Sequence, residues 1–273
     1  MRKGMIVRET FELIKSKLGE RFNQIKIEQL VAGVHFTAVK LSGGFAGVAS
    51  TNLNSVESCI SNRERGFGNF TPGNFQGNSI AALFSHDDES VFIETVRLAV
   101  MNALSAELIA ESAYHIIRNC DPIELVDLHG SKRICMVGAF LSYLKKIAGT
   151  GNPLQVVELD QSAMPDEFRQ YYIPFHHATE AISQSEIIII TGASLANNTL
   201  DSLLGMAPST AQVILVGPTG SLLPDLLFDR GVNIVGATRL TDADRTLQLV
   251  AEGAAGFHLF RYCAEKICIL NES

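Results

Sequence analysis

The sequence has no apolar run of the length that a helix needs to cross a bilayer, about 18 residues. Its first residues carry two positive charges with no apolar stretch behind them, so we expect no signal peptide there. The five cysteines are widely spaced, which is typical of a reducing compartment and not of a disulfide framework. We therefore expect a cytoplasmic protein.

A run of basic residues is also missing, and the formal net charge is −7. Nucleic acid and membrane surfaces are therefore not expected as partners. Hydrophobic residues make up 47% of the chain and charged residues 19%, a composition that supports a large core and excludes a disordered protein. At 273 residues the chain is long enough for two domains of ordinary size.

The first half predicts a small antiparallel sheet backed by helices. Apolar residues spaced by three and four indicate one helix over 7–22 and another over 91–117. Between them lie three short apolar runs separated by glycine turns, which are typical of hairpins, at 25–31, 36–41 and 46–49. An exposed edge of such a sheet would allow a homodimer.

A long loop and a polar boundary complete the organisation of the first half. Residues 51–77 are rich in glycine, proline and asparagine, and loops of this length are usually functional or mobile. The polar stretch 127–132 contains Gly130 and separates the two halves. We expect one domain over 1–128 and a second over 129–273.

The second half contains four short runs of Val, Ile and Leu, each followed by small or polar residues and a helix-like stretch. Such runs predict parallel strands whose sheet is covered by helices on both faces; they are Ile134–Val137, Leu154–Leu159, Ile187–Ile190 and Val213–Val216, with a weaker fifth at Val232–Val235. The expected fold class is α/β. Ligands of such sheets bind outside the carboxyl ends of the strands.

The first two runs end in residues that could contact such a ligand. Gly138 begins a turn that would present backbone N–H groups to an anion, although a plain strand-to-helix turn explains it equally well. Phe140 stands where the dinucleotide pattern needs a second glycine, so NAD is not supported as a cofactor. Glu158 is placed to hold ribose hydroxyls, and Asp160 lies close by; both are otherwise solvated acids at a strand end.

The next two runs end in neutral polar residues. Asn and Thr side chains after the third run predict either a polar cradle for a ligand or a helix cap. The fourth run ends in a sharp turn at the same edge of the sheet. The candidate ligand-binding residues from these two turns are Thr191, Gly192, Ser194, Asn198, Thr199, Gly217 and Pro218.

Metal and nucleophile motifs are weak. The adjacent pair His176–His177 has no third ligand at a helpful spacing, and adjacent side chains point apart. Cys263 and Cys268 lie in an apolar pattern and are expected to be buried structural thiols. Neither a nucleophile elbow nor a phosphate loop is present in the sequence. No catalytic residue can be named.

Several segments together resemble the family of putative heavy-metal-chelation proteins, over nearly the whole chain. They are FTAVKLSGGFAGVAS (36–50), LAVMNALSA (98–106), VGAF (137–140), EIIIITGASLANNTLDSLL (186–204) and VGPTGSLLPDLLFDRGVNIVGAT (216–238). The resemblance implies a lead domain like the N-terminal domain of enolase, then a Rossmann-like three-layer domain, with a ligand cleft between them. Enolase chemistry is not implied, because its metal carboxylates belong to a barrel that this chain lacks.

The resemblance also implies a link to metal chelation or to a chelating or heterocyclic molecule. Two functions follow. A binding protein would hold a small polar molecule or a metal chelate at the strand ends, under the lead domain and the loop 51–77. An enzyme of small-molecule metabolism, acting on a heterocycle or a nucleotide-derived substrate, would use the same cleft, with Glu158 or Asp160 as acid, base or hydroxyl anchor. The sequence alone leaves both open.

Overall fold

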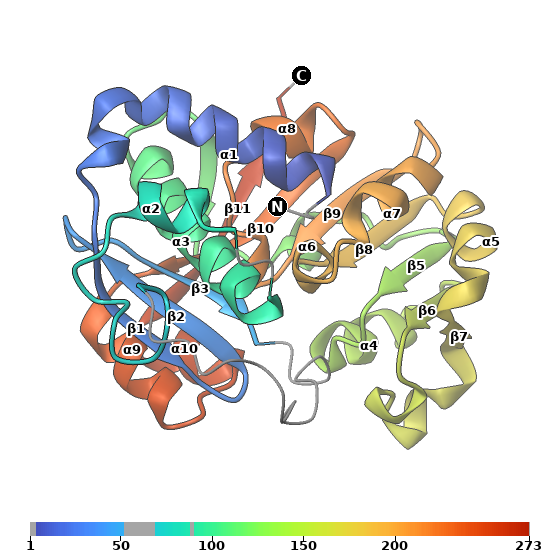
Figure 1. The fold of residues 1–273 in the computed structure, drawn as a ribbon. Coiled ribbons are helices and arrows are strands. Elements are labelled where there is room, and N and C mark those ends of the chain that lie inside the picture. The colour runs from blue at the N-terminus through green and yellow to red at the C-terminus, as the bar shows by residue number, and fades with distance from the viewer. Residues whose placement is uncertain (1–3, 52–68, 88–89, 273) are drawn as a thin grey trace.

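The computed structural model describes residues 4–51, 69–87 and 90–272, and in them the chain forms two sheets (Figure 1). The small sheet has three antiparallel strands in the order β1-β2-β3. The large sheet has eight strands in the order β4-β11-β10-β9-β8-β5-β6-β7. All pairs in the large sheet are parallel except β10–β11 and β11–β4. The expected α/β class is confirmed, with a small antiparallel and a larger, mostly parallel sheet.

The small sheet lies between helices on both of its faces. It is built from β1 (Ile27–Ala32), β2 (Phe36–Leu41) and β3 (Ala46–Ser50), close to the predicted runs. On one face lies α3 (Val91–Ala110), and a Cβ at Gly47 would overlap the backbone of Ala99 and Ala103, so only glycine permits this close approach. The other face packs on Leu247, Val250 and Leu259, a cluster contributed by helices from the far end of the chain.

Helices at the start of the chain flank this sheet. They are α1 (Met5–Leu18), followed by the 3-10 turn η1 (Gly19–Asn23), and α2 (Ile80–Ser85). The buried Ile14 and Leu18 confirm the predicted apolar face of the first helix, which ends at Leu18, and Phe22 is buried in the 3-10 turn that follows. Of the predicted loop 51–77, residues 52–68 lie outside the described residues, and 69–77 form turns that bury Phe70 and Phe75.

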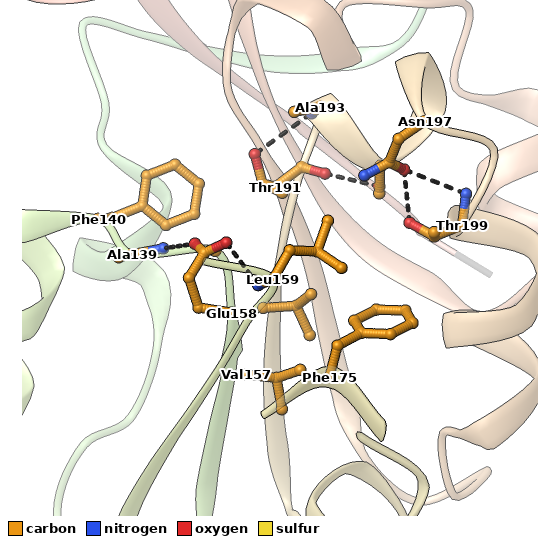
Figure 2. A pocket seen from close by; sticks show the side chains of 13 residues that line it. Ala139, Phe140, Val157, Glu158, Leu159, Phe175, Thr191, Ala193, Asn197 and Thr199 are labelled. Atoms are coloured by element: carbon orange, nitrogen blue, oxygen red, sulfur yellow. Dashed lines mark hydrogen bonds between the residues drawn. The ribbon is translucent and has the colours of Figure 1, made fainter. Parts of the chain in front are cut away.

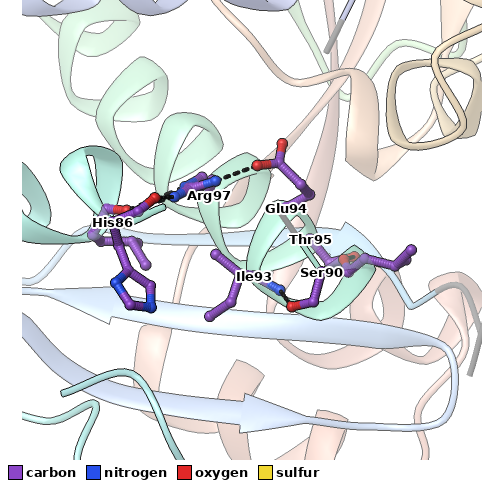
Figure 3. Close-up of polar contacts among 8 residues, drawn as sticks. His86, Ser90, Ile93, Glu94, Thr95 and Arg97 are labelled. Carbon is purple, nitrogen blue, oxygen red and sulfur yellow. Dashed lines mark hydrogen bonds and ion pairs between the residues drawn. The ribbon is translucent and has the colours of Figure 1, made fainter. Parts of the chain in front are cut away.

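A buried arginine joins α2 to α3 (Figure 3). Arg97 is 1% exposed, and its guanidinium donates to the carbonyl of Leu83 from Nε (3.1 Å) and from Nη2 (3.0 Å). It also donates to the carbonyl of His86 and forms an ion pair with Glu94. The last carbonyls of a helix have no partner within the helix, so Arg97 satisfies those at the end of α2.

The predicted second helix ends earlier than expected. It stops at Ala110, and residues His115–Arg118 form β4, which pairs with β11 (Ala264–Leu270) at the edge of the large sheet. Ile116 and Ile117 are β-branched, and pairing with a strand at the other end of the chain outweighs the helical pattern before them. The large sheet thus includes a strand that precedes position 128.

The remaining strands match the predicted runs, except β7, which no run predicted. They are β5 (Ile134–Val137), β6 (Leu154–Glu158), β7 (Tyr172–Pro174), β8 (Ile187–Thr191), β9 (Gln212–Val216) and β10 (Val232–Leu240). From β5 the chain runs outward to β6 and β7, returns to β8 on the other side, and continues to β9 and β10. The strand order therefore reverses between β5 and β8, which is the place where open α/β sheets bind ligands.

Helices and 3-10 turns cover both faces of the large sheet (Figure 1). The helices after β5 are α4 (Leu141–Ala148), α5 (Ala178–Ser183), α6 (Ala193–Ala196), α7 (Leu200–Met206), α8 (Asp225–Phe228), α9 (Ala243–Ala251) and α10 (Gly256–Tyr262). Of these, α9 and α10 pack on the small sheet. The 3-10 turns are η3 (Pro122–Leu125), η4 (Gln161–Ala163), η5 (Asp166–Tyr171), η6 (Phe175–His177) and η7 (Pro218–Gly220).

The two faces of the large sheet carry separate cores. One cluster contains Tyr143, Leu144 and Ile147 of α4, and the other contains residues of α1, α3, α5 and α7. Because the second cluster includes side chains of both sheets, the small sheet's helices and the large sheet share one core. No helix in the described part of the chain is long and apolar enough to cross a membrane.

Candidate functional site

A hollow of about 270 Å³ lies at the carboxyl ends of β5, β6 and β8, where the strand order reverses (Figure 2). We call it the strand-tip hollow. Six of the predicted site residues line it: Gly138, Phe140, Glu158, Thr191, Ser194 and Thr199. Residues from three strands thus meet where the sheet topology predicts a ligand.

Gly138 makes the turn between β5 and α4 possible. Its φ is +95°, a conformation that side chains other than glycine rarely adopt. A Cβ at this position would also lie 3.0 Å from the Cβ of Thr191 on the neighbouring strand. The turn therefore brings the ends of β5 and β8 close together, and Phe140, the residue before α4, borders the hollow.

Glu158 occupies the anion position of this turn. Its Oε2 accepts a hydrogen bond from the backbone N–H of Ala139 (3.0 Å), and its Oε1 accepts one from the N–H of Leu159 (2.7 Å). A carboxylate from the chain itself therefore sits where a helix start would attract a phosphate. A second anion would be repelled there, which agrees with the absence of the dinucleotide glycine pattern.

The other wall of the hollow is a set of polar side chains that follow β8. The hydroxyl of Thr191 accepts from the N–H of Ala193 (3.2 Å), and the hydroxyl of Ser194 donates to the carbonyl of Thr191 (2.6 Å). The Oδ1 of Asn197 accepts from the N–H and the hydroxyl of Thr199, at 3.2 and 2.7 Å. These bonds fix the side chains in place before any ligand arrives.

The structure places five of the eleven predicted residues outside the lining of this hollow, and three of them have other structural roles. Asn198 has a φ of +61°, and its Oδ1 accepts from the N–H of Gly4 (3.3 Å), so it holds the start of the chain. Asp160 is exposed and caps η4, and hydrogen bonds from Ser162 lower its pKa. Gly192 donates its N–H to the carbonyl of Val216 (2.7 Å) and packs against the backbone of Gly220.

Gly217 and Pro218 line a second hollow of about 290 Å³, and Phe140 borders both. We call it the Phe260 hollow. It lies between α4, α10 and the carboxyl ends of β9 and β10. The predicted residues thus divide between two neighbouring spaces at one edge of the sheet.

Sequence reasoning did not name seven further lining residues of the strand-tip hollow, and Leu159, Phe175 and Asn197 are the three that matter for a ligand. Leu159 is 63% exposed, and Phe175 follows β7, which no apolar run announces. Asn197 directly precedes the predicted Asn198, so the polar composition of this segment was the one signal that could have indicated Asn197 as a lining residue. Every lining residue lies between 137 and 199, so no described residue of the lead part caps this hollow; residues 52–68 of the predicted loop lie outside the described residues.

The donor set of the strand-tip hollow does not fit a bare heavy-metal ion. Over residues 4–51, 69–87 and 90–272, no group of three or more His, Cys, Asp or Glu side chains is placed to hold a metal. Among the described residues, Glu158 is the single ionisable side chain lining the hollow, and both of its oxygens already accept N–H groups. Soft metals prefer thiolates and imidazoles, whereas the other polar atoms here are hydroxyls and an amide.

The remaining metal candidates do not change this result. The rings of His176 and His177 lie 4.3 Å apart in η6, and neither lines the strand-tip hollow. Cys263 and Cys268 are buried, as predicted. Burial raises the pKa of the Cys263 thiol, which disfavours the thiolate that binds metals.

The fold and the hollow define an α/β protein with a ligand space at the switch point of its sheet. Comparison with known families then identifies the chain. A model of the DUF364 family, described as putative heavy-metal chelation, matches residues 121–269, and a DUF4213 model with the same description matches residues 15–105. The chain belongs to this family, as its resemblance predicted.

Similar proteins agree with the fold. An uncharacterized protein of Methanocaldococcus jannaschii is 24% identical, over 96% of each chain. The crystal structure of a DUF364 protein of unknown function from Pyrococcus horikoshii has a TM-score of 0.75 at 21% identity and covers 96% of this chain and 100% of its own. A second DUF364 structure, from Desulfitobacterium hafniense, has a TM-score of 0.71 at 18% identity and covers 97% and 99%. These likenesses show a shared fold.

Proposed function

We propose that this protein binds a small polar or heterocyclic molecule, or the organic part of a metal chelate, in the strand-tip hollow. The observation that supports this most is the convergence of the ends of β5, β6 and β8 at the switch point of the sheet, with polar side chains contributed by β6, β8 and the segment after β8. The family description points to metal chelation, and the hollow's chemistry decides which part of a chelate the protein would recognise.

An organic ligand fits the walls better than an ion does. Phe140, Phe175 and Leu159 offer apolar surface, and Leu159 remains largely exposed. Thr191 and Asn197 present polar groups on the other wall (Figure 2). A flat ring with donors and acceptors along one edge would bury apolar area and satisfy the polar wall together. In this proposal any metal is brought by the ligand.

The amide nitrogen of Asn197 is the donor best placed to select such a ligand. Its oxygen is held by Thr199, which fixes the orientation of the amide. Asn197 itself is exposed, so the nitrogen's two N–H groups remain accessible to a ligand. A heterocyclic nitrogen or a carbonyl oxygen would accept from them.

The enzyme alternative needs an acid or base in the hollow. Glu158 is the candidate, but both of its oxygens already accept backbone N–H groups and are held in place by them. A group fixed in this way is better suited to shaping the turn than to exchanging protons. We therefore favour binding over turnover.

Native mass spectrometry of the purified full chain tests the proposal. We expect an organic adduct on the wild type that is lost from the variants Thr191→Val and Asn197→Leu, which remove polar groups at nearly constant volume. The substitution Asn233→Leu is not a suitable control, because the Oδ1 of Asn233 accepts a hydrogen bond from the N–H of Val213 in the large sheet (2.7 Å). The exposed His176→Ala is the better control, and it should keep the adduct.

Elemental analysis of the same samples separates ion from chelate. Any metal on the wild type should leave together with the organic adduct in both hollow variants. Metal that stays bound to Thr191→Val and Asn197→Leu after the adduct is lost would contradict the proposal, as would an adduct that persists in both variants.

A further inference from the structure

The Phe260 hollow contains charge chemistry that the proposed function does not use. Lys266, on β11, forms an ion pair with Asp121, and the hydroxyl of Tyr143 donates to the other oxygen of the same carboxylate. Asp121 is 12% exposed and Lys266 42% exposed. The carboxylate is thus committed to protein partners, while the ammonium reaches the hollow.

The protonation states follow from these contacts. Burial alone would raise the pKa of Asp121, but the hydrogen bonds from Lys266 and Tyr143 outweigh burial and hold that pKa below its usual range. Burial, reinforced by Asp121, raises the pKa of Tyr143, so its phenol keeps its proton. At neutral pH Asp121 is therefore an acceptor, and Tyr143 and Lys266 are donors.

A buried hydroxyl without a partner lies next to Lys266. Thr238 is 8% exposed, and among the described residues its Oγ1 makes no hydrogen bond. Thr238 and Lys266 are directly paired across β10 and β11, so their side chains stand on the same face of the sheet. Buried polar groups almost always have a hydrogen-bond partner, so we expect a ligand in the hollow to supply one for the hydroxyl of Thr238.

Three phenylalanine rings also line the hollow. Phe260 lies with its ring centre 5.4 Å from the Nζ of Lys266, and Phe257, on the same helix, is 70% exposed. Phe140 forms part of the wall toward the strand-tip hollow. An exposed ring beside a fixed ammonium is an arrangement that a flat ring with an attached acid would complete.

We propose that the Phe260 hollow binds an aromatic or heteroaromatic carboxylate. Its carboxylate accepts hydrogen bonds from the ammonium of Lys266 and the hydroxyl of Thr238, and its ring packs against Phe257 and Phe260. Asp121 and Tyr143 are positioning residues, because Asp121 holds the ammonium of Lys266 and Tyr143 holds the carboxylate of Asp121. This site is separate from the strand-tip hollow, so either proposal can fail alone.

Isothermal titration calorimetry of the full chain with benzoate and with pyridine-2-carboxylate tests the inference. We expect both to bind at least about tenfold more tightly than benzamide, which lacks the charge, and than cyclohexanecarboxylate, which lacks the flat ring. Lys266→Met should weaken benzoate binding by about tenfold or more, and Thr238→Val by about fivefold at nearly constant side-chain shape.

Two controls locate the effect. Lys146→Met removes an ammonium from α4 that is 49% exposed and paired with Glu124 (3.6 Å), and it should leave benzoate binding unchanged. Thr191→Val, in the strand-tip hollow, should do the same. If Lys266→Met does not fold, Thr238→Val and Phe260→Leu still carry the test.

Three results would overturn the inference. One is the absence of binding heat for both acids up to about 20 mM, which corresponds to negligible affinity. Another is equal affinity for benzoate, benzamide and cyclohexanecarboxylate. The third is benzoate binding that Thr191→Val abolishes and Thr238→Val leaves intact, since the acid would then occupy the other hollow.

Discussion

Two cations of this chain, Arg97 and Lys266, have very different surroundings. Arg97 joins α2 to α3 and directs its guanidinium to the carbonyls of Leu83 and His86 and to Glu94, with almost no exposure (Figure 3). Lys266 has Asp121 as its ion-pair partner and keeps 42% of its side chain exposed at the rim of a hollow. Arg97 therefore stabilises the fold, whereas the ammonium of Lys266 has N–H groups that can still donate to a ligand.

The difference gives a practical rule for separating structural from functional charge. A guanidinium with its donors directed at main-chain carbonyls has no capacity for a ligand. An ammonium held by one carboxylate beside an unpartnered hydroxyl has capacity, and the aromatic rings around it define which ligands fit. Four experiments can break or sharpen this contrast.

The largest effect is expected for Arg97→Met. The substitution leaves the carbonyls at the end of α2 and the carboxylate of Glu94 without their buried donor, so we expect a loss of about 3–5 kcal/mol in the free energy of unfolding. Urea denaturation monitored by circular dichroism measures it. Benzoate affinity of the folded variant should be unchanged. A loss below about 1 kcal/mol would show that the cation is not structural.

A smaller loss is expected for Gly192→Ala. The new Cβ would overlap the backbone of Gly220, so the turns after β8 and β9 must separate, at a cost of about 2 kcal/mol. Gly205→Ala is the matched control, because no atom lies within 4 Å of its Cβ and alanine favours the helix α7 by up to about 1 kcal/mol. Equal unfolding midpoints for the two variants would contradict the close approach.

The Asp121→Asn variant tests the charge at the Phe260 hollow through pH. The pKa of Asp121 is lowered in the folded chain, so its stabilisation is present above the unfolded pKa of about 4 and is lost as pH falls through the lower folded pKa. The free energy of unfolding of the wild type should exceed that of Asp121→Asn by about 2 kcal/mol at pH 7, and this difference should disappear in acid.

Asp166→Asn is the control for this pH series. Asp166 pairs with Arg169 on an exposed turn, at 2.7 Å, and 87% of its side chain is exposed. Its substitution should change the unfolding midpoint little. If the difference in the free energy of unfolding between wild type and Asp121→Asn stays constant from pH 7 to about pH 3, the carboxylate of Asp121 is not stabilised by Lys266.

The smallest effect is expected for Asp160→Ala. Asp160 caps η4 through Ser162 in an exposed loop and does not line either hollow. The unfolding midpoint should shift less than for any variant above, and the adduct seen by native mass spectrometry should persist. Loss of the adduct would return Asp160 to the site and require a different geometry for the loop after β6.

The sequence predicts the centre of the fold better than its ends. Runs such as Ile187–Ile190 are buried on both faces, so their composition alone indicates a parallel strand. Ile116 and Ile117 pair with β11, whose residues lie about 150 positions away, and no local pattern reveals such a partner. The helices α9 and α10 also remained unpredicted, and their buried residues pack on the small sheet at the other end of the chain.

The same limit applies to the candidate site. Gly138 and Thr191 follow buried strands, and parallel topology brings such positions together, so they could be named in advance. Asn197 and Asn198 could not be separated by sequence, since the positive φ of Asn198 turns its side chain toward Gly4. Lys266 and Thr238 met only through the antiparallel pairing of the last two strands.

Phe140 lines both hollows, and this shared ring has a thermodynamic consequence. A molecule that fixes one rotamer of the ring also sets the shape of the neighbouring space. If the occupants of the two spaces prefer different rotamers, each must weaken the other by the same factor, and if they prefer one rotamer, each must strengthen the other equally. The aromatic side chain would then make the two binding events cooperative without any movement of the backbone.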